Sequence, residues 1–94
     1  MISADDRSLL RLFVLIRAAN ERVSNEGLLA EVERRNIPGF TATALRGVVL
    51  SLIRRRLIRP VKGDESALEA TKQGQEAARE ARARLTNLMT VLDD

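Results

Sequence analysis

The sequence predicts a mainly α-helical domain with one small β-hairpin. Four segments repeat apolar residues every three or four positions, which is the spacing of an amphipathic helix. Between the third and the fourth of these segments, residues 57–71 change to short β-permissive runs around the turn KGDES, as in a hairpin. A chain of 94 residues without linkers or internal repeats is long enough for one domain with a modest core.

The first predicted helix covers residues 6–20 and is apolar around much of its circumference. Its main apolar stripe consists of Leu9, Leu12, Phe13, Ile16 and Ala19, and Leu10, Val14 and Leu15 widen this stripe. A helix with so wide an apolar surface is expected to be covered from more than one side.

The second predicted helix, NEGLLAEVERRN, follows Ser24, which has the side chain of a helix N-cap. Pro38 disfavours helical geometry at Ile37, and Gly39 eases the turn, so the helix should end before this segment. The predicted buried face consists of Leu28, Leu29 and Val32.

The third predicted helix covers residues 42–56, and either Thr41 or Thr43 can cap its start. Its apolar residues follow the spacing of a buried helix face, and they are Leu45, Val48, Val49, Leu52 and Ile53. The opposite face carries Thr43, Arg46, Gly47, Leu50, Arg54 and Arg55. This face is positively charged, because the helix contains no acidic residue.

The predicted hairpin spans residues 57–71, with Leu68 facing the core and Pro60 restricting its own strand to the edge of the sheet. Thr71 then caps a long last helix over residues 72–94. Small and apolar residues recur along this helix at intervals of four and three, which is typical of a seam between paired helices. They are Gly74, Ala78, Ala81, Leu85, Leu88 and Leu92.

Positive charge is concentrated in the middle of the chain. Residues 34–63 contain eight basic residues and no Asp or Glu, so this segment carries +8, although the whole chain carries only +3. The eight are Arg34, Arg35, Arg46, Arg54, Arg55, Arg56, Arg59 and Lys62. A solvated face, in a protein whose many arginines reflect a GC-rich genome, is the plainer interpretation, but it does not explain the missing acids. We therefore favour a surface that binds a polyanion.

The residue inventory argues against several other functions. Phe13 and Phe40 are the only aromatic residues, so a base-stacking platform for single strands is not expected. Without Cys or His, the sequence predicts no metal site, no cofactor and no histidine base. The five serines have no base beside them, and the adjacent carboxylates at residues 5–6, 64–65 and 93–94 are explained by capping and solubility. We predict a protein that is not an enzyme.

The ends and the hydropathy of the chain indicate its compartment. The first residues, MISADDRS, are acidic where a secretory signal is basic. No apolar run approaches the roughly 18 to 20 residues that cross a bilayer. The sequence therefore predicts a cytoplasmic protein without membrane contact.

Two stretches resemble bacterial transcription regulators. LRGVVLSLIRRRLIR at residues 45–59 and LEATKQGQEAARE at residues 68–80 are similar to the recognition helix, first wing strand and last-helix start of PadR-like and, more distantly, MarR-like proteins. The resemblance covers roughly residues 9–92 and implies a winged helix-turn-helix.

These regulators usually carry Gly where this chain has Arg56. A left-handed Arg56 would cost about 1 kcal/mol relative to Gly, so the helix exit is either strained or rearranged.

The resemblance implies that double-stranded DNA is the partner, with residues 42–56 in the major groove and residues 57–71 as the wing along the backbone. Arg46 would donate two hydrogen bonds to a guanine. Thr41 and Thr43 would contact a phosphate or a thymine methyl group. The residues expected to contact phosphates are Arg54, Arg55, Arg59 and Lys62.

The resemblance also divides the chain into a DNA-binding part, residues 1–71, and a dimerisation helix, residues 72–94. The apolar seam of this helix is longer than so small a body can cover, so we expect a homodimer. The expected interface residues are Ala78, Ala81, Leu85, Leu88, Met89 and Leu92.

Regulators of this kind often respond to small apolar effectors, but a chain with two aromatic residues predicts no roomy effector pocket. Two alternatives stay open: a protein-interaction module with the same fold, and an architectural protein that coats DNA without sequence preference.

Overall fold

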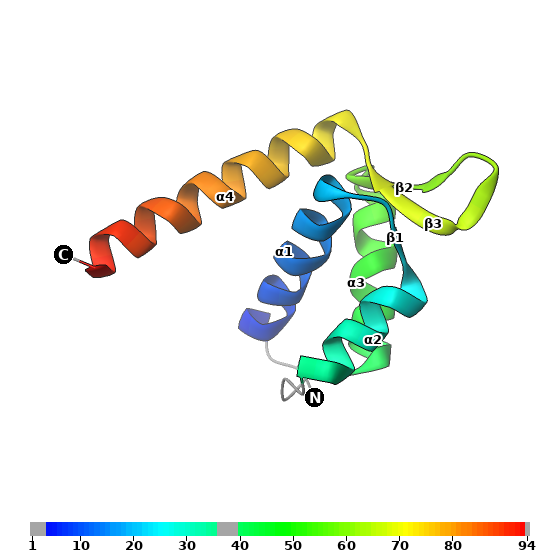
Figure 1. Ribbon diagram of the computed structural model, residues 1–94, viewed down its shortest axis with the longest axis horizontal. Coiled ribbons are helices and arrows are strands. Elements are labelled where there is room, and N and C mark those ends of the chain that lie inside the picture. The colour runs from blue at the N-terminus through cyan, green and yellow to red at the C-terminus, as the bar shows by residue number, and fades with distance from the viewer. Residues whose placement is uncertain (1–3, 36–39, 94) are drawn as a thin grey trace.

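The computed structural model describes residues 4–35 and 40–93, and within them four helices accompany a three-stranded antiparallel sheet (Figure 1). In chain order the elements are α1 (Ala4–Asn20), β1 (Val23–Ser24), α2 (Asn25–Arg35), α3 (Ala42–Arg54), β2 (Ile58–Val61), β3 (Asp64–Ala70) and α4 (Lys72–Asp93). The predicted break at Pro38 and Gly39 lies outside the described residues. This architecture confirms the predicted fold class.

Two helices begin where the sequence predicts. The Ser24 hydroxyl accepts a hydrogen bond of 2.9 Å from the Gly27 amide in the first turn of α2. Thr41 Oγ1 accepts a hydrogen bond of 3.1 Å from the Ala44 amide in the first turn of α3. Each bond satisfies a backbone donor that the first turn of a helix leaves free. Thr41, and not Thr43, is therefore the cap of α3.

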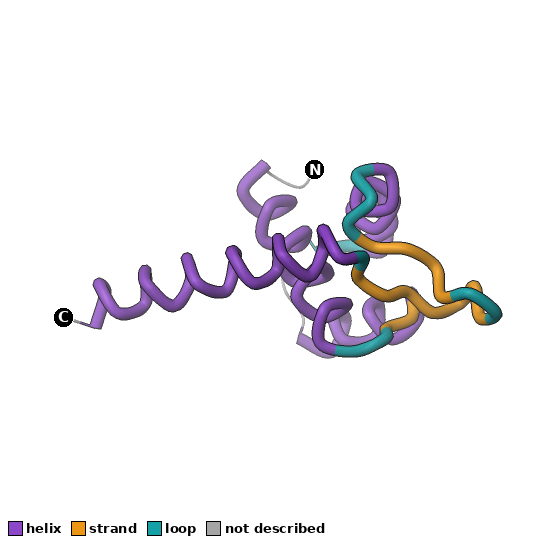
Figure 2. Tube along the Cα trace, turned by 90° about the horizontal axis from the view of Figure 1, so that it is seen from above, coloured by secondary structure: helices purple, strands orange, loops and turns teal. Residues whose placement is uncertain are grey.

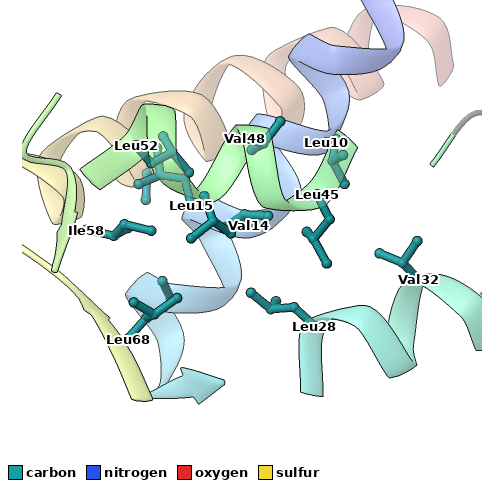
Figure 3. Close-up of a cluster of buried hydrophobic side chains, with 13 residues drawn as sticks. Leu10, Val14, Leu15, Leu28, Val32, Leu45, Val48, Leu52, Ile58 and Leu68 are labelled. Atoms are coloured by element: carbon teal, nitrogen blue, oxygen red, sulfur yellow. The ribbon is translucent and has the colours of Figure 1, made fainter. Parts of the chain in front are cut away.

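The hydrophobic core lies where α1, α2 and α3 meet the sheet (Figure 3). The buried face of α3 is the predicted one, with Ile53 only partly buried. Leu68 points inward from β3, as predicted, and Ala78 adds to the core from α4. Further buried apolar side chains are Leu10, Val14, Leu15, Ala18, Leu28, Val32, Leu45, Val48, Val49, Leu52, Ile58 and Val61. Removing these aliphatic groups from water is the main force that holds the elements together.

The buried face of α1 differs from the predicted stripe. Leu9 is 56% exposed, and the rest of that stripe is only partly buried: Leu12, Phe13, Ile16 and Ala19. The buried face consists of the residues predicted to widen the stripe, together with Ala18. Helical spacing cannot choose between two adjacent apolar faces, and here packing against α3, α4 and β3 makes the choice. The prediction that this helix is covered from several sides is confirmed.

The sheet has one strand more than predicted, and its order is β1-β3-β2. The short β1 strand pairs Val23 with Leu68 and Ser24 with Ala67. Two residues are too few to show a strand pattern in the sequence, so the pairing depends on the folded position of β3. β2 lies at the edge of the sheet, which confirms the prediction made from Pro60.

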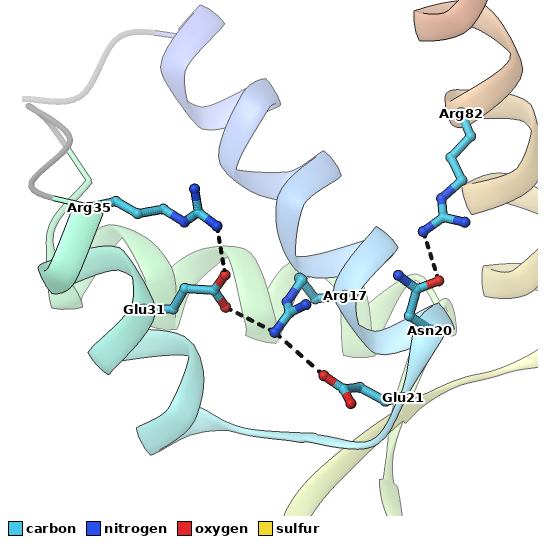
Figure 4. A network of polar contacts seen from close by, with 6 residues as sticks. All are labelled: Arg17, Asn20, Glu21, Glu31, Arg35 and Arg82. Carbon is cyan, nitrogen blue, oxygen red and sulfur yellow. Dashed lines mark hydrogen bonds and ion pairs between the residues drawn. The ribbon is translucent and has the colours of Figure 1, made fainter.

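The first half of α4 packs on α1, whereas its second half extends away from the other elements (Figures 1 and 2). Gln75 Nε2 donates a hydrogen bond of 3.1 Å to the Ala19 carbonyl oxygen. About two turns later, Arg82 Nη2 donates a hydrogen bond of 2.7 Å to Asn20 Oδ1 (Figure 4). From Arg82 to the last described side chain, every residue of α4 is exposed.

A buried carboxylate joins α1 to α2 (Figure 4). The side chain of Glu31 is only 10% exposed, and its two oxygens lie 3.2 Å from Arg17 Nη2 and 3.2 Å from Arg35 Nη2. Arg17 Nη2 also lies 3.4 Å from Glu21 Oε1. A buried carboxylate needs such partners, because an unpaired charge is strongly disfavoured away from water. Arg35 is therefore engaged within the domain, although the sequence grouped it with the basic surface.

Candidate nucleic-acid interface

α3 presents one continuous exposed face that carries no acidic residue. The exposed residues of this face are Thr43, Arg46, Gly47, Leu50 and Arg54, and Arg55 follows at the helix end. The opposite side of the helix is held in the core, so the exposed face has a fixed orientation. Thr41 caps the helix with its oxygen and keeps its hydroxyl hydrogen as a donor. The predicted division of this helix into an apolar and a basic face is confirmed.

Four arginines on and just after α3 have unengaged guanidinium groups. Arg46, Arg54, Arg55 and Arg56 are exposed, and they form no ion pair or side-chain hydrogen bond with any residue that the structure describes. A guanidinium offers five N–H donors in a planar fork, which matches two acceptors of a phosphate or of a guanine. Because the four side chains need not first leave a partner, this region is available to an anionic surface.

The chain leaves α3 in a left-handed conformation at Arg56, where φ is 61°. The Arg56 amide donates to the Ile53 carbonyl oxygen at 3.0 Å, and the Leu57 amide donates to the Leu52 carbonyl oxygen at 3.0 Å. These bonds close the helix end, and α3 ends at Arg54, two residues earlier than predicted. The exit is therefore strained, and it keeps the geometry that a glycine usually supplies.

Thr71 connects the end of α3 to the start of α4. Its hydroxyl donates a hydrogen bond of 2.5 Å to the Arg56 carbonyl oxygen and accepts one of 3.1 Å from the Gly74 amide. A Cβ added at Gly74 would lie 1.8 Å from the Leu57 carbonyl oxygen, so only glycine fits there. The threonine and the glycine of LEATKQG thus hold together the point where α3, the hairpin and α4 meet (Figure 1).

The hairpin brings acidic residues to the basic ones. Arg59 on β2 lies opposite Glu69 on β3, and their side chains form an ion pair of 3.5 Å between Arg59 Nε and Glu69 Oε1. Lys62 is exposed at the turn, and Asp64 and Glu65 follow it on β3. Residues 34–63 contain no acidic residue, but in the folded hairpin the acidic residues of β3 lie close to the basic residues of this segment. The cross-strand register would have shown this pairing, but the sequence alone does not give the register.

The apolar seam of α4 divides into two parts. Ala78 is 3% exposed and already belongs to the core of its own domain, so it is not available to a second chain, contrary to the interface predicted. Ala81 is half-buried. Leu85, Leu88 and Met89 are 41%, 54% and 57% exposed. The side chain of the last predicted interface residue, Leu92, lies outside the described part of the chain.

A hollow of about 480 Å³ lies between α1 and α2, which differs from the expectation of no roomy pocket. Its walls include both phenylalanines of the chain, Phe13 and Phe40, and it borders the buried Glu31. None of the described helices has the length and apolarity needed to cross a membrane.

No protein-family model and no curated protein sequence matches the chain. Among solved structures, the chain is similar to ZitR of Lactococcus lactis, a double-substitution variant in its apo form. The two share 16% sequence identity and a TM-score of 0.69, over 96% of this chain and 67% of ZitR. At this identity the likeness concerns the fold, and the PadR-like assignment stays a prediction. The chain therefore has the fold of a winged helix-turn-helix domain with a long C-terminal helix.

Proposed function

We propose that this protein binds double-stranded DNA sequence-specifically as a dimeric transcriptional regulator. Residues of α3 lie in the major groove, and the hairpin of β2 and β3 acts as the wing along the backbone. The observation that carries the proposal is the exposed, acid-free face of α3 together with the helix exit, where Arg46, Arg54, Arg55 and Arg56 are all unengaged.

Different parts of this surface have different roles. Arg46 lies in the second turn of α3, where a side chain reaches base edges, and its fork matches guanine O6 and N7. Arg54 and Arg55 lie at the far end of the helix, closer to the phosphates. Lys62 contacts the backbone from the wing. The carboxylate of Glu69 offsets part of the charge of Arg59, which makes the net contribution of Arg59 to phosphate binding small.

The second half of α4 provides the dimer contact. Leu85, Leu88 and Met89 form an exposed apolar stripe on a helix that extends beyond its own domain. Pairing this stripe with that of a second copy removes it from water. A twofold axis through the paired helices would present two α3 helices to successive major grooves, roughly 34 Å apart on a palindrome.

The proposal is tested by selecting bound duplexes from a random pool and comparing two variants on the selected site. Arg46→Ala should cost about 1 to 3 kcal/mol on the preferred duplex and relax the preference for one base pair. Lys62→Ala should weaken binding to all duplexes about equally. Equal losses from both variants on every duplex would contradict base reading by Arg46. Failure to enrich any site, with binding retained, would favour an architectural protein.

A further inference from the structure

Gly47 is a glycine that the fold itself does not require. It lies inside α3, outside the left-handed region of φ, and a Cβ added to it would meet no atom within 4 Å. A glycine inside a helix weakens that helix relative to alanine. Gly74 shows the contrast, because there an added Cβ would collide with the backbone. The packing of this chain therefore explains Gly74 but not Gly47.

Leu50 lies beside Gly47 on the same exposed face. The two residues are three apart, which makes them neighbours on a helix surface. Leu50 is 49% exposed, and it is the one large apolar side chain on the exposed face of α3. Gly47 and Leu50 thus form a patch, the Gly47–Leu50 patch, with little bulk at one end and an apolar side chain at the other. Arg46 and Arg54 flank the patch.

We propose that the Gly47–Leu50 patch reads a thymine in the major groove, an inference that rests on the proposed function. The missing Cβ at Gly47 lets the α3 backbone approach the base edges closely. Leu50 then contacts the 5-methyl group of thymine, which is the apolar group that the major groove offers. The unengaged Arg46 and Arg54 favour this polyanionic occupant over an apolar protein surface, which would leave both charges buried without partners.

The role of Leu50 is tested with the preferred duplex, in which each thymine is replaced in turn by deoxyuridine. This replacement removes only the 5-methyl group and keeps the base pair. The wild-type chain should lose about fourfold in affinity at one position of each half-site, as expected for one buried methyl-sized group. Leu50→Ala should bind the two duplexes equally. The matched control Leu9→Ala, an exposed leucine on α1, should keep the wild-type difference.

The role of Gly47 is tested by Gly47→Ala, for which stability and binding should change in opposite directions. Tm should rise by about 4 °C, because alanine favours the helix by about 1 kcal/mol. Affinity for the preferred duplex should fall about tenfold, because the added methyl group prevents the close approach. Asn87→Ala, at an exposed position of α4, should raise Tm and leave the affinity unchanged.

Two results would overturn the inference while leaving the proposed function intact: wild-type binding that is indifferent to every deoxyuridine, or Gly47→Ala binding that matches the wild type. A patch that docks a protein would give both results together. If the wild-type chain bound no duplex even at low salt, the proposed function would fail, and the inference would fail with it.

Discussion

The Thr71 hydroxyl donates a hydrogen bond of 2.5 Å to the Arg56 carbonyl oxygen across fifteen residues of sequence. The same hydroxyl oxygen accepts from the Gly74 amide and so caps α4. One side chain thereby links the exit of α3, which carries the proposed DNA contacts, to the start of the helix that carries the proposed dimer contact. The angle between these two helices depends on this junction.

Replacing Thr71 by Val should lower the free energy of unfolding by about 2 kcal/mol. The variant loses the cap of α4 and leaves the Arg56 carbonyl oxygen without its donor. Urea denaturation measures the change. Thr71→Ser keeps the hydroxyl and should stay close to the wild type. Equal stability of the valine and serine variants would contradict the structural role of the hydroxyl.

Replacing Gly74 by Ala should destabilise the protein by about 3 kcal/mol, because the new Cβ would lie 1.8 Å from the Leu57 carbonyl oxygen and the backbone would have to move. Gly47→Ala is the matched control, since there the same added methyl group meets nothing. Thermal unfolding should therefore give opposite signs for the two substitutions. A harmless Gly74→Ala would show that α4 does not approach Leu57 this closely.

Replacing Arg56 by Gly should raise the free energy of unfolding by about 1 kcal/mol. The backbone at this position is left-handed, a conformation that glycine adopts without the steric cost of a Cβ. Arg55→Gly removes the same charge at a right-handed position, where φ is −81°, and should destabilise instead. If both variants lost stability equally, the left-handed exit would be refuted.

The local parts of the fold were predictable because short-range chemistry determines them. The N-cap residue type at Thr41 predicts the start of α3. The helical spacing of its apolar residues predicts the buried face, which consists of Leu45, Val48, Val49 and Leu52. The α1 stripe could not be placed correctly, because Leu9 and Leu10 are equally apolar and only the packing of α3, α4 and β3 decides which one is buried.

The candidate site was predictable on α3 and less so on the hairpin. Helical spacing alone places Arg46 and Arg54 on the exposed face. The pairing of Arg59 with Glu69 depends on the register of two strands, which spacing does not reveal. Likewise, the burial of Ala78 depends on how closely α4 packs on α1. The sequence could therefore not show that the first part of the α4 seam packs on its own domain while the second part is exposed.

If the apolar stripe of α4 forms the dimer contact, acidic substitutions within this stripe should dissociate the dimer. The wild-type chain should sediment as a dimer at micromolar concentration, and the double variant Leu85→Asp with Leu88→Asp should sediment as a monomer, because two carboxylates cannot be buried in the stripe. Ala83→Asp with Asn87→Asp adds the same charge to other exposed positions of α4 and should leave the dimer intact. A monomeric wild type, or a leucine variant that still dimerises, would remove α4 from this role.

The most direct test of the account is the salt dependence of binding to an arbitrary duplex. The three expected phosphate contacts other than Arg59, namely Arg54, Arg55 and Lys62, predict a slope of log K against log salt on the order of −3 for each bound protomer. Lys62→Ala should make the slope shallower by about 1. A slope near zero, or no binding at low salt, would contradict DNA binding by this surface and favour a protein-interaction module.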